Sequence, residues 1–285
     1  MRNGFLVVST ALWLSLFGGY ADAQEAVTVS DGVIAAQNTA LLANARGSGS
    51  GPQSPRDLSL HKGKNLRVFG YAPEREKLNL CNIHLHENAE HRGGQFTTFA
   101  GDGDGHGNGS GFKYDGKLTA PELEPLGYPV GASEEGDLVP GDTVEVHFVY
   151  TSADTKPGVT LGSCFTESAK NPQLRVEAVI AVLVNDPNAA SMSRLAEINR
   201  VASYYQATNL PNHLGRPIRY IGSTTGPNYN EVASPFQVTW SVRPKVLKVD
   251  IGSVALWLSD NPFKETHAHG VRNLVTDPEL LSPIE

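Results

Sequence analysis

The apolar residues of this 285-residue chain gather in short runs rich in β-branched or aromatic side chains. Turn residues flank most of these runs, a pattern typical of strands. Strands are predicted at residues 66–71, 80–86, 143–150, 174–184, 236–242 and 254–258. The pattern indicates a mainly β protein, a β-rich α+β fold built on an antiparallel sheet or sandwich with one or few helices.

One helix is predicted, at residues 191–204. Met192, Leu195, Ile198 and either Val201 or Ala202 recur there at helical spacing. We expect this apolar stripe to pack on the core. No internal repeat of fixed period is visible, so a single domain is the simplest organisation.

The first residues predict export. Arg2 precedes an apolar run at residues 5–17, and the small residues Ala21 and Ala23 follow it. This pattern predicts a signal peptide over residues 1–23, and the alternative is an uncleaved membrane anchor. No other stretch approaches the roughly 18–20 apolar residues of a membrane span. We therefore expect a periplasmic or secreted protein with no membrane contact after cleavage.

The rest of the chain is predicted to divide into an arm and a body. Residues 24–64 are interpreted as an N-terminal arm or linker, because residues 44–57 are rich in Gly, Ser and Pro and offer little apolar surface to bury. Residues 65–285 are predicted to form one β-rich catalytic domain. Within it, residues 101–111 (GDGDGHGNGSG) are expected to form a surface loop that contributes little to the sheet.

Charge and cysteine content narrow the possible functions. The formal net charge is -7 and no cluster of Lys and Arg is present, so nucleic acid is a poor candidate partner. Cys81 and Cys164 are the only cysteines. An even count in an exported chain favours a disulfide, with two buried free thiols as the alternative.

Candidate metal ligands lie in the strand predicted at residues 80–86. Strict alternation places Asn82, His84 and His86 on one face, and the cysteine, isoleucine and leucine between them on the other. Two histidines spaced in this way are about 6.5–7 Å apart along a strand. Their ring nitrogens can therefore converge on one ion at about 2.0–2.1 Å.

A third histidine, His147, lies in the strand predicted at residues 143–150, opposite its core-facing valines and beside Glu145. If the two strands are neighbours, the three histidines form a site with a fourth position open, as in catalytic zinc sites. The alternative is that all three occupy the solvated face of a sheet. Glu90 and His91 follow the first pair closely, and such a cluster suits metal ligands together with their hydrogen-bonding partners.

Glu177 is a further candidate, because it lies in an otherwise apolar strand at residues 176–184. A carboxylate there is costly without a partner. Glu177 is expected either to receive hydrogen bonds from the metal site or to lie at the exposed start of the strand.

The segment at residues 79–91, NLCNIHLHENAEH, resembles the signature of the delta-class carbonic anhydrases, including bacterial members. Shorter segments at residues 146–152, 161–164, 175–178 and 267–272 are also similar to blocks of that family. The resemblance therefore runs in patches through the predicted body. It implies a zinc enzyme for the reversible hydration of carbon dioxide, with three histidine ligands carried onto His84, His86 and His147.

In such an enzyme, zinc lowers the pKa of its bound water from 15.7 to about 7, so a zinc-bound hydroxide can attack carbon dioxide at neutral pH. A histidine can then carry the released proton, and His91, His267 and His269 are the candidates. For His267 and His269, a role at the surface or as a partner of the ligands is the preferred alternative, and a role as a metal ligand is the third. Glu90 and Glu177 are candidates for orienting the hydroxide. Carbon dioxide and bicarbonate are the only partners that the sequence implies, and it does not indicate an oligomeric state.

Two other classes of function remain open at this stage. A cupin-like oxygenase or hydrolase also begins with a His-x-His pair and commonly adds a carboxylate ligand, for which Glu90 is available. An exported, non-enzymatic metal-binding module is the second alternative, suggested by Asp102, Asp104 and Asn108. That loop departs from a calcium-binding EF-hand, because its twelfth position is Lys113 where a glutamate is required.

Overall fold

The computed structural model describes residues 28–65, 67, 69–224 and 229–284. The predicted signal peptide lies outside these residues. Among the residues described, no helix combines the length and the apolar character that a membrane crossing requires.

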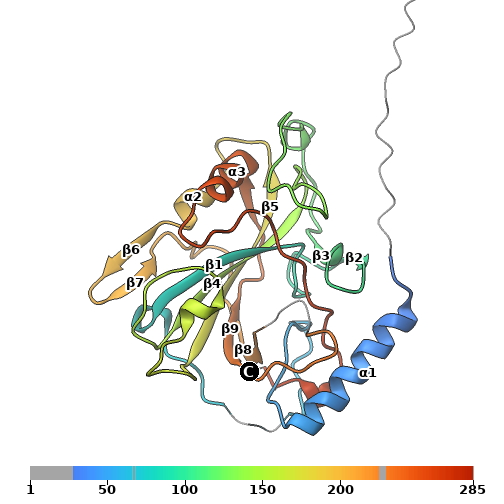
Figure 1. The fold of residues 1–285 in the computed structure, drawn as a ribbon. Helices are drawn as coiled ribbons and strands as arrows, with labels where there is room; N and C mark the ends of the chain where they lie inside the picture. The colour runs from blue at the N-terminus through green and yellow to red at the C-terminus, as the bar shows by residue number, and fades with distance from the viewer. Residues whose placement is uncertain (1–27, 66, 68, 225–228, 285) are drawn as a thin grey trace, which may run out of the picture.

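A six-stranded sheet forms the centre of the molecule, in the order β1-β4-β5-β9-β8 with β10 beside β5 (Figure 1). β1, β4 and β5 are antiparallel to one another in turn, whereas β9 and β10 run parallel to two different stretches of β5. The predicted β-rich class is confirmed, and the sheet is mixed rather than antiparallel. Its strands are β1 (Asn79–Glu87), β4 (Thr143–Thr151), β5 (Leu174–Val184), β8 (Ile218–Ser223), β9 (Gln237–Val242) and β10 (Leu247–Asp250).

Smaller elements surround the sheet. Two hairpins are formed by β2 (Thr98–Asp102) with β3 (Ser110–Lys113), and by β6 (Ile198–Val201) with β7 (Tyr204–Ala207). The described helices are α1 (Asp31–Ser48), α2 (Met192–Leu195) and α3 (Ile251–Ser259), with short 3-10 turns at η1 (Arg75–Lys77), η2 (Pro121–Leu123), η3 (Leu161–Cys164) and η4 (Pro278–Leu280).

The central sheet is buried on both faces. One face packs Ile83, Val146 and Phe148 into the largest hydrophobic cluster, which also includes Trp257 of α3. The other face contributes Val149, Ala178 and Trp240 to a second cluster. Burial on both sides explains why β5 is apolar over most of its length rather than alternating.

Four predicted strands are confirmed, because β1, β4, β5 and β9 cover nearly the residues expected. The strand predicted at residues 66–71 lies partly outside the described residues, and those of its residues that are described form no strand. The strand predicted at residues 254–258 is wrong, since these residues belong to α3. Asp250 caps that helix by accepting hydrogen bonds from the backbone amides of Gly252 and Ser253, which is a strong helix-start signal.

The helix predicted at residues 191–204 is also wrong beyond its first turn. Only α2 forms, and the chain then turns into the β6–β7 hairpin. Met192 and Leu195 are buried as the apolar stripe required, but Val201 is exposed. Ala202, with φ of 54°, occupies the turn between the two strands. The β-branched and aromatic residues around it favour a hairpin over a longer helix.

The N-terminal arm is more ordered than its composition suggests. Residues 31–48 form α1, which lies along one side of the molecule (Figure 1). Leu41 and Ala45 of this helix pack with Val275 and Leu280. Residues 51–58 follow in buried positions, so they are not a free linker. Several of their polar side chains have internal partners; the Gln53 amide, for example, donates to the carbonyl of Ser234.

Candidate metal centre

The pairing of β1 with β4 brings the three predicted histidines together. His84 lies directly opposite His147, and His86 lies opposite Glu145. Nε2 of His84 is 3.2 Å from Nδ1 of His147. One ligand nitrogen from each of His84, His86 and His147 falls within 4.8 Å of the others. The strands that sequence alone could only assume to be neighbours are therefore adjacent and in the required register.

Hydrogen bonds leave the inward nitrogens of the first two rings available. Nδ1 of His84 donates to the side-chain oxygen of Asn82 at 2.6 Å. Nδ1 of His86 donates to the backbone carbonyl of Gly270 at 2.9 Å. Each bond fixes the tautomer of its ring, so Nε2 carries the lone pair.

His147 is held in the reverse orientation. Its Nε2 donates to Oε1 of Glu145 at 2.9 Å, which leaves Nδ1 to face His84. The three outer acceptors are thus an amide, a backbone carbonyl and a carboxylate. These are the groups that commonly orient histidine ligands of zinc.

The cluster fits a tetrahedral metal ion by two observations. Nε2 of His86 is buried without a hydrogen-bond partner, and such an orphaned atom is costly unless something binds it. Two nitrogens bound tetrahedrally at about 2.0–2.1 Å are about 3.3–3.4 Å apart, close to the 3.2 Å between His84 and His147. A small ion that prefers imidazole nitrogen suits this arrangement.

The environment also adjusts the protonation of the three rings. Burial, together with the charges of the neighbouring imidazoles, holds the pKa of His84 well below its usual value. Burial lowers the pKa of His86 to about 4. Burial opposes charge on His147 as well, but its hydrogen bond to Glu145 and the charge of Glu90 outweigh burial and raise its pKa. His84 and His86 are therefore neutral at neutral pH, the form that binds metals.

Glu145 anchors a second layer behind the ligands. Its carboxylate also accepts hydrogen bonds from Nδ1 of His91 at 2.8 Å and from the backbone amides of Glu90 and His91. Burial opposes ionisation of Glu145, but the neighbouring His91 and His147 hold its pKa well below the usual range. Nε2 of His91 lies 2.7 Å from the hydroxyl of Tyr220. This fully buried layer keeps the Glu145 carboxylate fixed.

His91 therefore lies close to the metal cluster but cannot reach solvent. Its side chain is completely buried, and both ring nitrogens are occupied. Trp240 packs edge-on against the rings of His91 and His147, with centroids 4.8 and 5.0 Å away. The predicted role of His91 as a proton carrier is not supported by this position.

Glu90 lies near the ligands but behind them. Its carboxylate oxygens are 3.7 Å from Nδ1 of His86 and 3.7 Å from Nε2 of His147. Both of these nitrogens face away from the point on which the three rings converge. Glu90 is therefore positioned to influence the ligands electrostatically and not to bind the same ion.

Glu177 is not brought to the centre. In the β4–β5 register it lies opposite Phe148, whereas His147 lies opposite Ala178, so Glu177 projects from the other face of the sheet. Its carboxylate accepts hydrogen bonds from Arg175 at 2.7 Å and Arg243 at 2.9 Å. Its partners are thus two arginines and not the metal site, which explains a buried carboxylate in an apolar strand.

The second pair of histidines lies at the rim of the centre. The ring of His269 is 5.9 Å from that of His86 and 5.4 Å from that of His267. Nε2 of His269 is 2.6 Å from the carboxylate of Glu265, and 44% of its side chain is exposed. His269 thus connects the neighbourhood of the ligands with solvent.

Several residues of the site were not identified from the sequence. Glu145 could have been found, since alternation in its strand places it on the face of His147. Gly270, Tyr220 and Trp240 come from segments far from the ligands in sequence. Only the folded chain brings them to the site.

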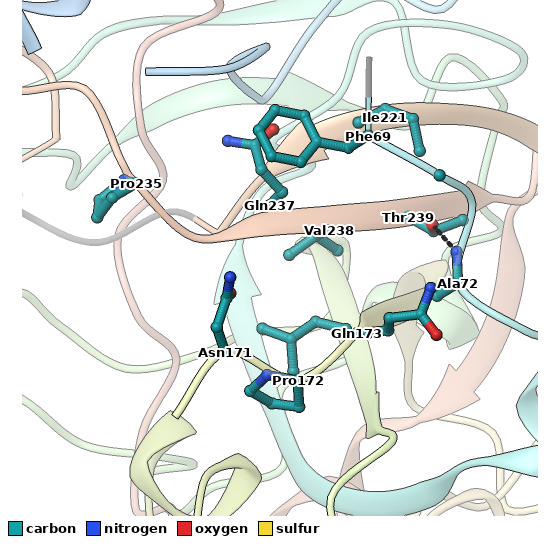
Figure 2. Close-up of a pocket in the computed structure, with 12 residues that line it drawn as sticks. Phe69, Ala72, Asn171, Pro172, Gln173, Ile221, Pro235, Gln237, Val238 and Thr239 are labelled. Atoms are coloured by element: carbon teal, nitrogen blue, oxygen red, sulfur yellow. Dashed lines mark hydrogen bonds between the residues drawn. The ribbon is translucent and has the colours of Figure 1, made fainter. Parts of the chain in front are cut away.

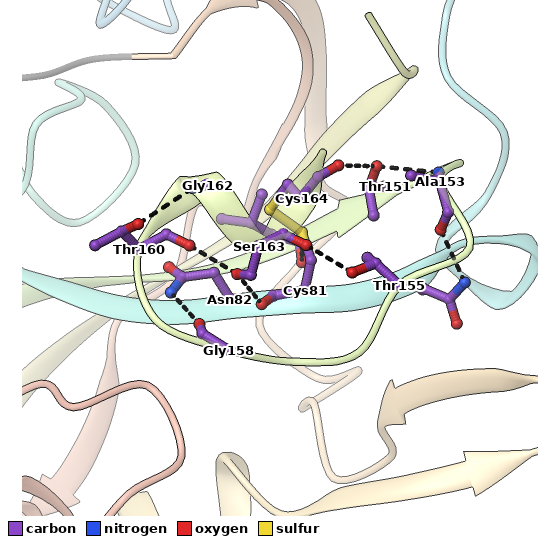
Figure 3. The surroundings of a disulfide bond; sticks show 12 residues. Cys81, Asn82, Thr151, Ala153, Thr155, Gly158, Thr160, Gly162, Ser163 and Cys164 are labelled. Carbon is purple, nitrogen blue, oxygen red and sulfur yellow. Dashed lines mark hydrogen bonds between the residues drawn. A yellow bond between two sulfur atoms is a disulfide. The ribbon is translucent and has the colours of Figure 1, made fainter. Parts of the chain in front are cut away.

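The predicted disulfide between Cys81 and Cys164 is confirmed (Figure 3), and Cys81 lies in the same strand as His84 and His86. A β-bulge at Cys81 places its side chain with Val149 and Ala178, and not on the face of the neighbouring isoleucine. The bridge joins β1 to η3. Asn82, the next residue, donates from its amide to the carbonyl of Gly158 at 3.1 Å.

The glycine-rich segment at residues 101–111 is part of the support of the site, not an independent loop. It forms the ends and turn of the β2–β3 hairpin, and the backbone amide of Val271 donates to the carbonyl of Gly107 at 2.8 Å. A side chain on Gly107 would lie 2.7 Å from the carbonyl of Val271. Glycine is required there because two backbones approach closely.

The same segment shows no arrangement suited to calcium. One carboxylate oxygen of Asp104 accepts the backbone amides of His106, Gly107 and Asn108, and the other accepts the Asn108 side chain. These oxygens stabilise the turn itself. Asp102 and Asp104 belong to no possible metal cluster among the residues that the structure describes.

A separate cavity of ≈ 180 Å³ lies away from the histidines, between the chain around Phe69, the turn at residues 171–173 and β9 (Figure 2). Its lining includes the side chains of Gln173, Gln237 and Val238. None of the described residues that line it is a histidine or carries a carboxylate.

Comparison with known proteins agrees with this chemistry. A family model described as delta carbonic anhydrase matches residues 75–253, which include all three histidines and both cysteines. No curated protein matches the chain.

Two solved structures are similar at low level. An alpha-carbonic anhydrase from Photobacterium profundum has 17% identity over 87% of this chain and 95% of that chain, with a TM-score of 0.30. A hyperthermostable carbonic anhydrase identified from an active hydrothermal vent chimney has 17% identity over 82% of this chain and 86% of that one, with a TM-score of 0.29. The family match spans more than half of the sequence, and on that basis the chain belongs to the delta carbonic anhydrase family.

Proposed function

We propose that the protein is a zinc-dependent carbonic anhydrase that catalyses the reversible hydration of carbon dioxide to bicarbonate and a proton. The observation that carries the proposal is the buried Nε2 of His86, which has no partner and converges with nitrogens of His84 and His147. Three imidazoles with one open position form the ligand set of catalytic zinc. Family membership supports the same reaction.

Zinc, when bound, lowers the pKa of a coordinated water to about 7 and so supplies a hydroxide nucleophile at neutral pH. His84, His86 and His147 would hold the ion. Asn82 and the carbonyl of Gly270 keep two of these rings in the correct tautomer. Their role is to keep the lone pairs aimed at one point without any rearrangement during turnover.

Glu145 holds the proton on Nε2 of His147, so that Nδ1 is the ligand atom. Its charge also makes His147 a stronger electron donor to the ion. Trp240, itself buried, packs against the ring of His147 on this side of the site. Glu90, buried behind two ligands, contributes a negative charge that influences the metal without binding it.

The proton released on hydration leaves through the exposed rim of the site. His269 is the proposed carrier, because its ring lies beside His86 and is partly exposed. Glu265 holds Nε2 of His269, which leaves Nδ1 to exchange the proton with buffer. His267, next to it, is the second carrier on this route.

Export is part of the proposal. A disulfide of this kind is typical of proteins that fold in an oxidising compartment, and the predicted signal peptide agrees with a periplasmic or secreted enzyme.

A carbon dioxide hydration assay tests the proposal. Protein loaded with one equivalent of zinc is expected to accelerate acidification of carbon dioxide solutions, and chelation should abolish that acceleration. Zinc bound stoichiometrically without any acceleration would instead favour a non-enzymatic metal-binding module. Activity that requires iron or manganese and acts on another substrate would favour an oxygenase.

A further inference from the structure

A second cleft with a positively charged lining lies at the β8 edge of the central sheet, away from the three candidate metal ligands. Its volume is ≈ 730 Å³. Its lining includes Glu74, Arg175 of β5, Arg216 just before β8, and Arg219 in β8. Neither the metal ligands nor their hydrogen-bonding partners belong to it.

The strand register separates this cleft from the metal centre. Arg175 is two residues from Glu177 in β5, so both side chains project from the face opposite His147. Arg219 pairs with Ser241, whose hydroxyl donates to the carboxylate of Glu177. Arg175 and Arg219 therefore share one face of the sheet, and His84, His86 and His147 occupy the other.

Positive charge is in excess within the lining. The only carboxylate among the described lining residues is that of Glu74, which accepts Nη2 of Arg175 at 3.0 Å and both terminal nitrogens of Arg219 at 2.9 and 3.1 Å. Arg216 is exposed and has no ion-pair partner in the described part of the chain. Three guanidinium groups thus face one carboxylate, on a protein whose formal net charge is -7.

The floor of the cleft is preorganised. The side chain of Arg175 is only 2% exposed, and Glu74 and Glu177 hold it from two sides. Ile218 and Ile284 add apolar surface beside the arginines. The Arg175 guanidinium thus adds a fixed positive charge beneath Arg216 and Arg219, and it loses no side-chain freedom when a ligand binds above it.

We propose that this cleft binds a small organic molecule that bears a carboxylate or phosphate group. Arg216 and the outer edge of Arg219 would bind the oxyanion, since a planar guanidinium matches both groups with paired hydrogen bonds. The two isoleucines would cover the apolar part of the ligand. The carboxylate of Glu74 competes for the same donors and therefore limits the affinity.

Isothermal titration at low ionic strength, with benzoate and phenyl phosphate as separate probes, tests this site. Glu74→Gln is expected to bind at least one probe severalfold more tightly than the wild type, because it removes the competing charge. Arg216→Ala combined with Arg219→Ala should weaken binding at least tenfold. Arg194→Ala, an exposed arginine elsewhere, is the matched control and should leave the affinity unchanged.

Anions can also bind at the open position of a metal, so the titrations are repeated in a His84→Ala variant. If the probes bind in the proposed cleft, the His84→Ala variant should still bind them, and Glu74→Gln should still raise the affinity in that background. Preference for phenyl phosphate over benzoate, or the reverse, would identify the oxyanion, and either supports the site. No binding of either probe by the folded wild type, or equal affinities in the Glu74, Arg216/Arg219 and Arg194 variants, would overturn it. Thermal unfolding of each variant verifies that it is folded.

Discussion

At the scale of single residues, the centre depends on acceptors outside the ligand set. Each ligand ring donates its outward N–H to a different group, and the strongest of these acceptors is the Glu145 carboxylate. Alternation in the sequence was sufficient to predict that His84, His86 and His147 face the same way. It could not predict that Glu177 turns to the opposite face, because a buried carboxylate in a strand has the same local pattern on either side.

Glu145→Gln should weaken zinc binding about 10–100-fold, because an amide accepts the proton of His147 less strongly than a carboxylate does. Competition with a fluorescent zinc chelator measures the change. Glu177→Gln is the matched control, since it also neutralises a buried carboxylate in the neighbouring strand. It should leave the zinc affinity unchanged even where it lowers the melting temperature. A larger loss of zinc with Glu177→Gln than with Glu145→Gln would contradict this assignment.

At the same scale, Gly270→Ala should reduce zinc affinity tenfold or more. A methyl group there would lie 2.7–2.9 Å from Asn108 Oδ1 and the carbonyl group of Gly107, so the carbonyl that holds His86 must move. Gly70 is the control, because a side chain at that position meets nothing within 4 Å. Equal zinc affinities for Gly270→Ala and Gly70→Ala would show that this carbonyl does not orient the ligand.

At the scale of elements, the sequence predicted strands well where burial and residue type agree. β5 was predicted with its observed bounds because it is apolar over most of its length and turn residues follow it. α3 was misassigned because a short apolar run fits a buried helix as well as a strand. The helix predicted at residues 191–204 is wrong for a different reason. Apolar residues happen to recur at helical spacing there, although the second half of the segment forms the β6–β7 hairpin.

The link between β1 and η3 predicts an effect of reduction on the metal. Cys164 holds η3 against β1, and the nearby carbonyl of Gly158 holds Asn82, which in turn orients His84. Cys81→Ser combined with Cys164→Ser should lower the free energy of unfolding by roughly 2–5 kcal/mol. It should also weaken zinc binding, because Asn82 becomes less constrained. Urea unfolding and chelator competition measure the two effects.

The two effects of that variant can be separated. Asn82→Ala keeps the disulfide and removes only the acceptor of His84, so it should weaken zinc binding with a smaller loss of stability. If the cysteine variant lost stability while its zinc affinity stayed at the wild-type value, the bridge would be structural only.

At the scale of the whole molecule, the sheet separates two environments. Its one face carries a compact histidine centre, and its other face carries the arginine and glutamate network around Glu177. Composition could not predict which face carries the histidines and which carries Glu177, because this depends on which strands pair and in what register. The N-terminal arm shows the same limit: its Gly, Ser and Pro content resembles a linker, yet Gln53 and Ser54 are buried by pairing with segments far along the chain.

Removal of the metal should make the stability of the molecule depend on pH. The pKa values of His84 and His86 are lowered on folding, in the case of His86 to about 4. The unfolded chain, with histidine pKa values of about 6.5, therefore binds protons first as the pH falls. The metal-free protein should lose stability as the pH falls from about 6.5 towards 4. His147, whose pKa is raised, opposes this trend only in part.

Urea unfolding of chelated protein at several pH values measures this dependence, and the His84→Asn and His86→Asn double variant should show a shallower slope. Stability that is constant or increases as the pH falls over that interval would contradict the protonation states assigned to the site.

The central claim is that His84, His86 and His147 together hold a catalytic zinc ion. The most direct measurement determines zinc stoichiometry and carbon dioxide hydration side by side in single alanine variants. His84→Ala, His86→Ala and His147→Ala should each lose zinc and activity together, because two imidazoles are too few to retain the ion. His269→Ala should keep zinc and slow turnover only in weak buffer, since buffer can replace a proton carrier but not a ligand. Zinc retained by His147→Ala and lost from His269→Ala would contradict the account.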